Sequence, residues 1–298
     1  MSVADQPETR LASSGGSSGA SRRSVRRTMR TIAFYTALVA GGLILLAPVL
    51  WMVSASLMTN ADLLSSEVHL IPPTWHPENY VQIFTAFRFG RFVLNSVIVT
   101  GSVVVSNVIL CSVVGYGLAK FDFPGKSLIF GFIMVTIMVP FTVLIIPLYL
   151  TIRELGWINS YPGLIVPFAM TAFGVFMMRQ FAMSIPDDYL DAARVDGAGE
   201  FRIFLWIAVP LLRPAMAALA IVVFVINWDE FLWPLVVATQ DQYRTLPIGL
   251  SQFLEQYENQ WNLLMAGAVV AALPVVFLFL TLQKRFLESM QSLSGLSE

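Results

Sequence analysis

Six long apolar runs, separated by polar stretches, constrain the fold of this 298-residue chain more than any other feature. They cover about residues 31–55, 92–118, 127–150, 161–182, 203–227 and 262–283. An α-helix needs about 20 apolar residues to cross the hydrocarbon layer of a bilayer, and each run provides them. A helix also satisfies its own backbone hydrogen bonds, which lipid cannot do. The runs therefore predict an all-α, polytopic membrane protein with six transmembrane helices.

The composition excludes most other classes of protein. Apolar residues make up 56% of the chain and charged residues only 12%, whereas a soluble protein has roughly 25% charged residues. The net charge is −1, and Cys111 is the single cysteine. These values exclude a wholly disordered chain, binding of nucleic acid through a basic surface, and an internal disulfide.

The distribution of lysine and arginine predicts how the helices are oriented. With six spans, thirteen of the 18 basic residues fall on the side of the N-terminus and four on the opposite side. Arg213 lies inside the fifth run, between Pro210 and Pro214. Because basic residues accumulate in cytoplasmic loops, we expect both termini in the cytoplasm. Arg213 is then expected near the cytoplasmic end of its helix.

The segments outside the apolar runs define the domain organisation. Residues 1–30, rich in Ser, Gly and Arg, predict a disordered cytoplasmic tail, and residues 291–298 a short cytoplasmic tail at the other end. The six-helix transmembrane domain then covers residues 31–290. On the outer side, the loop at 228–261 suits either docking of a partner or anchoring by interfacial tryptophans. The loop after the first span contains apolar residues at helical spacing, namely Tyr80, Ile83, Phe84 and Phe87. This pattern predicts a short helix at the membrane surface.

The most informative polar stretch covers residues 184–202, SIPDDYLDAARVDGAGEFR. Ser184 is a suitable helix cap, and Asp187 and Asp188 are favourable in a first turn. Gly197 suits a helix end that needs a positive φ. The stretch predicts a helix of about ten residues on the cytoplasmic face and a second helix from Gly199 into the fifth span. Such a protruding helix–turn–helix suits docking into a partner, and a plain connecting loop fits the same pattern.

Polar residues inside the second run provide candidates for a solute path. Ser96, Thr100, Asn107 and Cys111 are spaced by 4, 7 and 4 residues, which places them on one helical stripe. Such a stripe lines a path or bonds to a neighbouring helix, and we favour packing because small polar residues are common helix contacts in lipid. The candidate path consists of Ser96, Thr100, Asn107 and Trp228.

Two further features of the spans bear on transport. Apart from Arg213, the span interiors hold no Asp, Glu, Lys or Arg, which are the groups that an ion-coupled transporter keeps at membrane depth. Energy for uphill transport would therefore come from elsewhere, and the solute is expected to be neutral or to be solvated by hydroxyls, amides and aromatic side chains. Pro140 and Pro147 remove backbone donors from the third span and predict a kink there, which suits either a moving helix or a structural bend.

Motifs for catalysis and nucleotide binding are missing from the sequence. Gly125-Lys126-Ser127 resembles the end of a phosphate-binding loop, but the first glycine of that motif would fall at Lys120. No HExxH or GxSxG motif is present, and the two histidines match no metal-ligand spacing. We therefore expect no catalytic residue and no metal site. A stand-alone channel leaves residues 184–202 unexplained, and a membrane enzyme lacks paired carboxylates at the membrane face apart from those expected to start a helix.

Residues 190–198 resemble the EAA loop of ABC importer permeases, whose pattern is E-A-A-x-x-D-G-A followed by Phe, Ile and Pro at set distances. Asp191 stands where the family has Glu, which keeps the carboxylate but shortens its reach. The positions that match in place are Ala192, Ala193, Asp196, Gly197 and Ala198. Further stretches resemble the carbohydrate branch of the maltose-permease type, among them 115–120, 138–140, 146–149, 228–235 and 246–250. The likeness covers about residues 30–290.

The resemblance implies the type I permease fold of an ABC importer, in a multi-pass subunit of the cytoplasmic (inner) membrane. The six EAA residues would contact separate ABC ATPase subunits that bind the ATP, so the chain itself would need no cofactor. The other implied partners are a second homologous permease subunit, an extracytoplasmic solute-binding protein and membrane lipid. The implied function is translocation of a sugar by alternating access. Permeases for glycerol phosphate, polyols or polyamines share much of the fold and stay open as alternatives.

Overall fold

The structure is a computed structural model that describes residues 17–67, 69–85, 87–255 and 260–294. In helical residues 17–28, 254–255 and 282–294 it describes only the course of the backbone. These described residues are helical or lie in turns and loops, and none of them lies in a strand. The predicted all-α class is thereby confirmed.

Four long helical stretches match four of the predicted spans. α1 covers Ser17–Ala55 and α4 covers Phe89–Lys120. α10 (Glu200–Ile203), a π-helical turn (Phe204–Ala208) and α11 (Val209–Trp228) continue into one another, and α14 covers Trp261–Ser294. Each contains a window that is long and apolar enough to cross a membrane. Because α1 begins at Ser17, it includes the second half of the tail for which the sequence predicts disorder. Residues 1–16 and 295–298 of the two predicted tails lie outside the described residues.

The other two predicted spans are broken helices. α5 (Lys126–Met138) and α6 (Phe141–Glu154) meet at an angle of 105°. The break falls at Val139 and Pro140, because the residue before a proline avoids the α conformation. Pro147 lies inside α6, where the helix continues, so the predicted kink arises at the first proline only. α7 (Tyr161–Ile165) with a 3-10 turn (Val166–Phe168) meets α8 (Ala172–Met183) at 43°.

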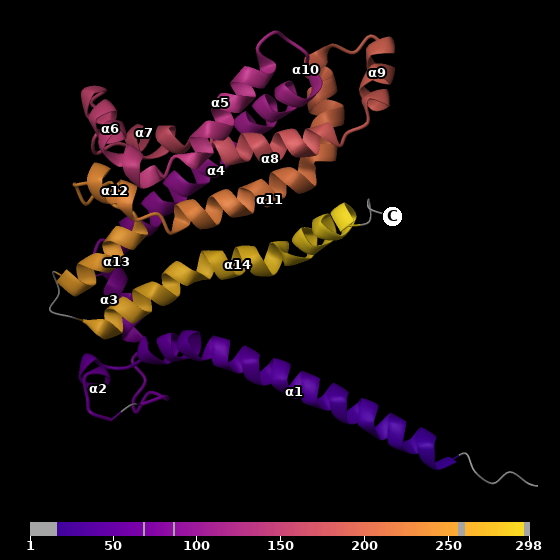
Figure 1. Ribbon diagram of the computed structural model, residues 1–298. Helices are drawn as coiled ribbons and strands as arrows, with labels where there is room; N and C mark the ends of the chain where they lie inside the picture. Colours follow the sequence, from indigo (N-terminus) through magenta and orange to yellow (C-terminus); the bar gives the residue numbers. More distant parts are fainter. Residues whose placement is uncertain (1–16, 68, 86, 256–259, 295–298) are drawn as a thin grey trace, which may run out of the picture. The chain divides into compact units, whose positions relative to one another are not determined.

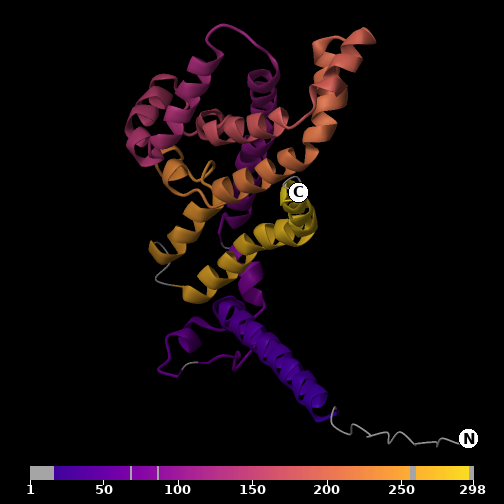
Figure 2. The same cartoon turned by 45° about the vertical axis from the view of Figure 1, so that its right-hand side comes forward.

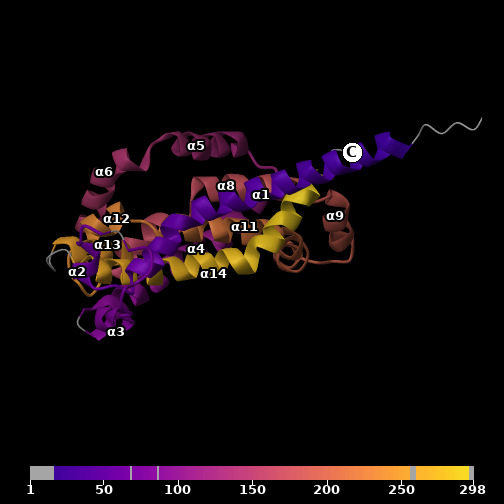
Figure 3. The ribbon, with the colours of Figure 1, turned by 90° about the horizontal axis from the view of Figure 1, so that it is seen from below.

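The chain divides into two compact units, residues 1–51 and 52–298. In the second unit, α4 packs against α8 and against α11, as Figures 1 and 2 show. Their buried apolar side chains form the largest core, which also takes in Leu190 and Ile203 from the segment between α8 and α11. A second core joins α3 (Glu78–Thr85), α13 (Leu246–Glu255) and α14. A third joins α6, α7 and α12 (Leu232–Val237). Figure 3 shows α5 and α6 on one side of this unit.

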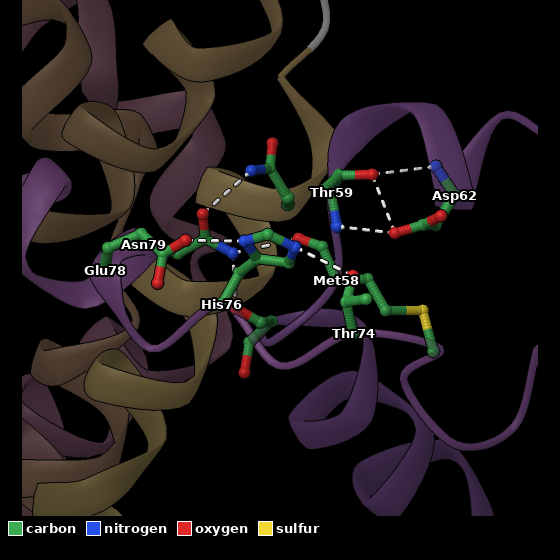
Figure 4. A network of polar contacts seen from close by, with 9 residues as sticks. Met58, Thr59, Asp62, Thr74, His76, Glu78 and Asn79 are labelled. Atoms are coloured by element: carbon green, nitrogen blue, oxygen red, sulfur yellow. Dashed lines mark hydrogen bonds and ion pairs between the residues drawn. The ribbon is translucent and has the colours of Figure 1, made fainter.

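The segment that follows α1 is fastened by polar contacts, some of which Figure 4 shows. The buried side-chain amide of Asn79, on α3, donates to the backbone carbonyls of Ser56 and Met58 at 2.9 Å. Asn262 on α14 donates to the Asn79 oxygen at 3.1 Å. The His76 ring lies between Thr74 and Glu78 and bonds to both. The short helix predicted for this loop is present as α3, with Ile83 fully buried. It ends at Thr85, so Phe87 of the predicted face lies beyond the helix.

A capping box starts the short helix α2 (Asn60–Leu63) in the same segment. The Thr59 hydroxyl accepts from the Asp62 N–H at 3.1 Å, and the Asp62 carboxylate accepts from the Thr59 N–H at 3.0 Å. Each side chain thus satisfies a backbone donor of the other residue, which is how a capping box stabilises a helix start.

Candidate functional site

The predicted coupling segment contains a nine-residue helix, α9 (Asp187–Val195). Asp187 and Asp188 lie in its first turn, as the sequence predicts, where their charges favour the positive end of the helix dipole. The predicted cap is wrong. Pro186 occupies the N-cap position, and Ser184 instead ends α8, with its hydroxyl donating to the Phe181 carbonyl at 2.7 Å. Proline supplies no side-chain hydrogen bond, so the two aspartates stabilise this helix start without a cap.

The C-terminal end of α9 is a complete Schellman motif around Gly197. The Gly197 N–H donates to the Arg194 carbonyl at 3.0 Å, and the Ala198 N–H donates to the Ala193 carbonyl at 2.9 Å. Gly197 has a φ of +80°, a conformation that costs every residue with a Cβ. The prediction that Gly197 ends the helix with a positive φ is confirmed. The motif turns the chain into α10, which starts at Glu200, one residue after the predicted start at Gly199.

Arg194 ties the two helices of this segment together. Its guanidinium donates to Asp191 at 2.7 Å, within α9, and to both carboxylate oxygens of Glu200 at 2.7 and 3.2 Å, across the turn. The hydrogen bond from Arg194 holds the pKa of Glu200 below its ordinary value. The pair fixes α10 against α9, and α10 continues into the fifth span.

The start of α9 is fastened to α4 by Lys120, the last residue of that helix. Its ammonium donates to the Ile185 carbonyl at 2.6 Å and to the Asp187 carboxylate at 2.7 Å. The Lys120 side chain is 6% exposed and that of Asp187 is 72% exposed, so a buried ammonium bonds to a carboxylate at the surface. This hydrogen bond and charge lower the pKa of Asp187. No motif in the sequence pairs these residues, which stand 67 positions apart.

The structure brings together the six residues predicted to contact the ATPase. Asp191, Ala192, Asp196 and Gly197 are exposed, and Ala193 and Ala198 are half-buried. Leu190 is buried in the core beneath them. Three large apolar side chains on the same segment are exposed, namely Tyr189, Val195 and Phe201. The sequence analysis did not single them out, although large apolar residues next to charged ones in two short predicted helices were a usable signal. The segment therefore offers a mixed apolar and acidic surface to a partner.

The polar stripe of α4 lies between helices. Asn107 is fully buried; its amide donates to the Val103 and Phe168 carbonyls, and its oxygen accepts from the Thr171 N–H at 3.1 Å and hydroxyl at 2.8 Å. These bonds hold α4 to the bend between α7 and α8. Ser96 accepts from the Leu246 N–H at 2.8 Å, and Thr100 is 1% exposed. In this structure the stripe makes helix contacts, the alternative that the sequence analysis favours.

Asn95, beside the stripe, was not among the predicted candidates. Its buried amide donates to the Gln242 and Arg244 carbonyls at 3.0 and 2.8 Å, and its oxygen accepts from the Tyr161 hydroxyl at 2.9 Å. It thus ties α4 to the loop before α13. A second polar residue directly before Ser96 was the only sign of this in the sequence.

Trp228, the fourth predicted path residue, ends α11 and is 5% exposed. Its indole stacks on Phe224 with ring centroids 5.4 Å apart, and its N–H donates to the Ala271 carbonyl at 2.9 Å. It also lines a cavity of about 400 Å³ together with Asp229 and with apolar side chains of α11, α13 and α14. Trp228 is thus a predicted path residue that lines a cavity in this structure. Among the described residues, no group of three or more His, Cys, Asp or Glu is placed to hold a metal ion.

The chain is similar to known transport proteins over most of its length. Residues 111–291 match the family model described as "Binding-protein-dependent transport system inner membrane component". A permease protein of Bacillus subtilis for arabinooligosaccharides, AraQ, is 37% identical over 251 residues, 83% of this chain and 89% of that protein. The Streptomyces coelicolor permease NgcG of a diacetylchitobiose uptake system is 33% identical over 252 residues, 83% of each.

Two further likenesses extend the comparison. The permease UgpE of an sn-glycerol-3-phosphate transport system in Brucella abortus (strain 2308) is 30% identical over 274 residues, 89% of this chain and 97% of that protein. Among solved structures, a chain of a bacterial ABC transporter that imports the acidic polysaccharide alginate superimposes with a TM-score of 0.77. It is 24% identical, and the match covers 87% of this chain and 98% of that one.

Proposed function

Since the chain belongs to the family of inner membrane components of binding-protein-dependent transport systems, we propose that the solute it carries is a neutral oligosaccharide or a related polyol. It is a multi-pass membrane permease subunit of an ABC importer and not an enzyme. The importer-permease fold expected from the sequence is likewise confirmed. Movement of the solute by alternating access follows from this family membership.

The observation that carries the proposed solute is the likeness to two sugar permeases over 83% of the chain. The charge distribution supports it. Within the described spans, charged residues lie near the helix ends, except Arg213, whose side chain is exposed and not in the core. A phosphorylated solute such as glycerol phosphate needs a cation along its path. The sugar permeases AraQ and NgcG therefore indicate the solute better than the glycerol phosphate permease UgpE does.

We propose three kinds of partner for this subunit. The surface of α9, with Asp191, Ala192 and Asp196 exposed, docks into an ABC ATPase subunit, which binds the ATP, so that this chain needs no cofactor. A second homologous permease completes the path. An extracytoplasmic solute-binding protein delivers solute on the opposite side, and a likeness in fold to an alginate importer crystallised with its periplasmic protein supports this arrangement.

The proposed orientation places α9 and both termini in the cytoplasm. Its basis is the excess of thirteen to four basic residues on that side. Lys120, Lys126 and Arg194 all lie at the α9 end of the second unit, in agreement with this orientation. A cysteine introduced at exposed Val195 should react with a membrane-impermeant thiol reagent only after the cells are opened. Reaction in intact cells would reverse the orientation.

The complete importer, reconstituted in proteoliposomes with its ATPase and binding protein, tests the function. We expect ATP-dependent uptake of a labelled arabino-oligosaccharide, chito-oligosaccharide or polyol, and none of glycerol 3-phosphate. Uptake of glycerol phosphate alone would overturn the proposed solute. Asp196→Lys should abolish binding of the ATPase, whereas Asp122→Lys, at an exposed aspartate of the same end, should not. Equal binding by both variants would contradict docking through α9.

A further inference from the structure

The helix α4 connects the coupling helix α9 with the loop before α13 at the other end of the membrane domain. We propose that α4 is the strut through which α9 and residues 240–246 move together, with Lys120 and Asn95 as the positioning residues at its two ends. The proposal rests on the proposed function, because it concerns how an ATP-driven movement crosses this subunit. Figures 1 and 2 show α4 running between these two regions.

At one end of α4, a buried leucine and a buried lysine link α9 to the membrane domain. Leu190 is the one buried side chain of α9, and it packs into the core formed by α4, α8 and α11. A second link to α4 is the Lys120 ammonium, which donates to the Ile185 carbonyl and the Asp187 carboxylate. A buried ammonium with two short, charge-assisted hydrogen bonds resists displacement more than an exposed ion pair does. Lys120 therefore fixes the start of α9 to α4.

At its other end, α4 is hydrogen-bonded to the backbone of residues 240–246. Asn95 is fully buried and donates to two carbonyls of that loop, those of Gln242 and Arg244. Ser96 accepts from the N–H of Leu246, and Arg91 donates to the Gln242 carbonyl at 3.2 Å. Bonds to the main chain hold the loop whatever side chains it carries. In the proposed orientation this loop lies on the outer side, where the binding protein docks.

Between the hydrogen bonds at its two ends, α4 is an unbroken helix. Asn95 and Lys120 are 25 residues apart, which corresponds to about 37 Å along a helix at 1.5 Å per residue. The α5–α6 pair bends by 105°, and a π-helical turn precedes α11. Breaks of this kind allow a displacement to be absorbed locally. An intact helix that is hydrogen-bonded at both ends is a contiguous rigid element of the kind through which coupling between distant sites travels.

The coupling ratio, solute transported per ATP hydrolysed, tests this strut in the reconstituted importer. Lys120→Met keeps the length of the side chain and removes its donors. We expect the ratio, and the stimulation of ATP hydrolysis by solute-loaded binding protein, to fall about tenfold, the scale of a lost hydrogen bond to a charged group. Lys120→Arg should restore both. Asn95→Leu should have the same effect as Lys120→Met, and the double variant should lose no more than either single variant, because both act on one route.

Two matched controls should leave the coupling ratio unchanged. Lys126→Met removes an ammonium whose partner, Asp122, is fully exposed at the same end of the protein. Ser106→Ala removes a hydroxyl of α4 that donates only within its own helix, to the Val103 carbonyl at 3.0 Å. Where Asn95→Leu lowers the thermal stability of the complex, Arg91→Ala provides the milder variant at the same end.

The outcomes separate this inference from the proposed function. No ATP-dependent sugar uptake by the unaltered importer would overturn the function itself. Normal uptake by the unaltered importer, with an unchanged coupling ratio in folded Lys120→Met or folded Arg91→Ala, would overturn the strut alone. Additive losses in the Lys120→Met, Asn95→Leu double variant would also overturn it, since they would place the two residues on separate routes.

Discussion

Arg194 and Glu200 join α9 to α10 across the Gly197 turn by a two-point contact, with the guanidinium donating to both carboxylate oxygens at 2.7 and 3.2 Å. The hydrogen bonds to Glu200 and then to Asp191 raise the pKa of Arg194. An arginine is charged at any physiological pH even without such a shift. Both partners are partly exposed, at 37% and 44%. The value of the pair therefore lies in the fixed angle between the helices more than in net stability.

Glu200→Gln should lower solute transport per ATP while changing the stability of the complex little. Removing an exposed ion pair costs about 0.2–1 kcal/mol, which shifts the melting temperature only slightly. The altered contact nevertheless loosens the joint between α9 and the fifth span. Transport and ATP hydrolysis measured on the same proteoliposomes check this. Asp122→Asn, which removes the charge of an exposed acid paired with Lys126 outside α9 and α10, serves as the control. An equal loss in both variants would show that the Arg194–Glu200 pair has no specific role.

Gly197→Ala should destabilise the coupling segment, because the left-handed conformation costs a residue with a Cβ about 1–2 kcal/mol. Nothing lies within 4 Å of the added Cβ, so the cost is conformational and not steric. Gly199, two residues further, has a φ of −73° and equally open surroundings. Gly199→Ala should therefore have no effect. Affinity for the ATPase, measured for both variants, distinguishes them, and equal affinities would contradict the Schellman geometry.

The turn at Gly197 could be predicted from the sequence because its cause is local. A glycine two residues after the end of a nine-residue helix needs no distant partner to define its conformation. Apolar length alone likewise predicts six segments that suit spans, of which the structure breaks two. Ser184 shows the limit of local reasoning. A serine before Ile-Pro-Asp-Asp fits a helix start, yet Ser184 lies at the end of the preceding helix α8. The break between α5 and α6 at Pro140 could be expected as a kink, but its angle depends on how the flanking helices pack.

The contacts that build the site across the chain could not be predicted. Lys120 bonds to residues 65 and 67 positions away, and Asn95 to a loop about 150 positions away. A single sequence holds no signal for pairs at such separations. Asn107 was recognised as part of a stripe, and the sequence also indicated packing as the better reading. Its actual partner, the bend before α8, became visible only in the structure.

Acidification below about pH 4 should open the start of α2. Hydrogen bonds from the hydroxyl and backbone N–H of Thr59 hold the pKa of Asp62 below its ordinary value. A carboxyl whose pKa is lowered in the folded state adds stability above its ordinary pKa, and that stability is lost as the pH falls through the folded value. Hydrogen exchange of a peptide covering residues 58–64, corrected for intrinsic rates, should show the opening. Asp62→Ala should exchange fast at both neutral and acid pH, and a pH-independent exchange in the unaltered protein would refute the prediction.

Gly115→Ala should weaken the contact between α4 and α8. A Cβ at Gly115 would lie 2.7 Å from the backbone nitrogen of Arg179 and 2.7 Å from the Cβ of Met178. Real Cβ atoms do not approach other atoms so closely. Small residues allow membrane helices to pack backbone to backbone, and forcing a methyl group into such a contact costs about 1–3 kcal/mol.

Gly117→Ala is the matched control on the same helix, since nothing lies within 4 Å of its added Cβ. It should leave the protein as stable as before or slightly more stable, because alanine is the better helix former by up to about 1 kcal/mol. Thermal melting of the two variants in detergent checks the pair. Because Gly115 lies five residues before Lys120, the first variant should also lower the coupling ratio by shifting the end of α4. Equal melting temperatures for both variants would show that α4 and α8 are not in backbone contact at this point.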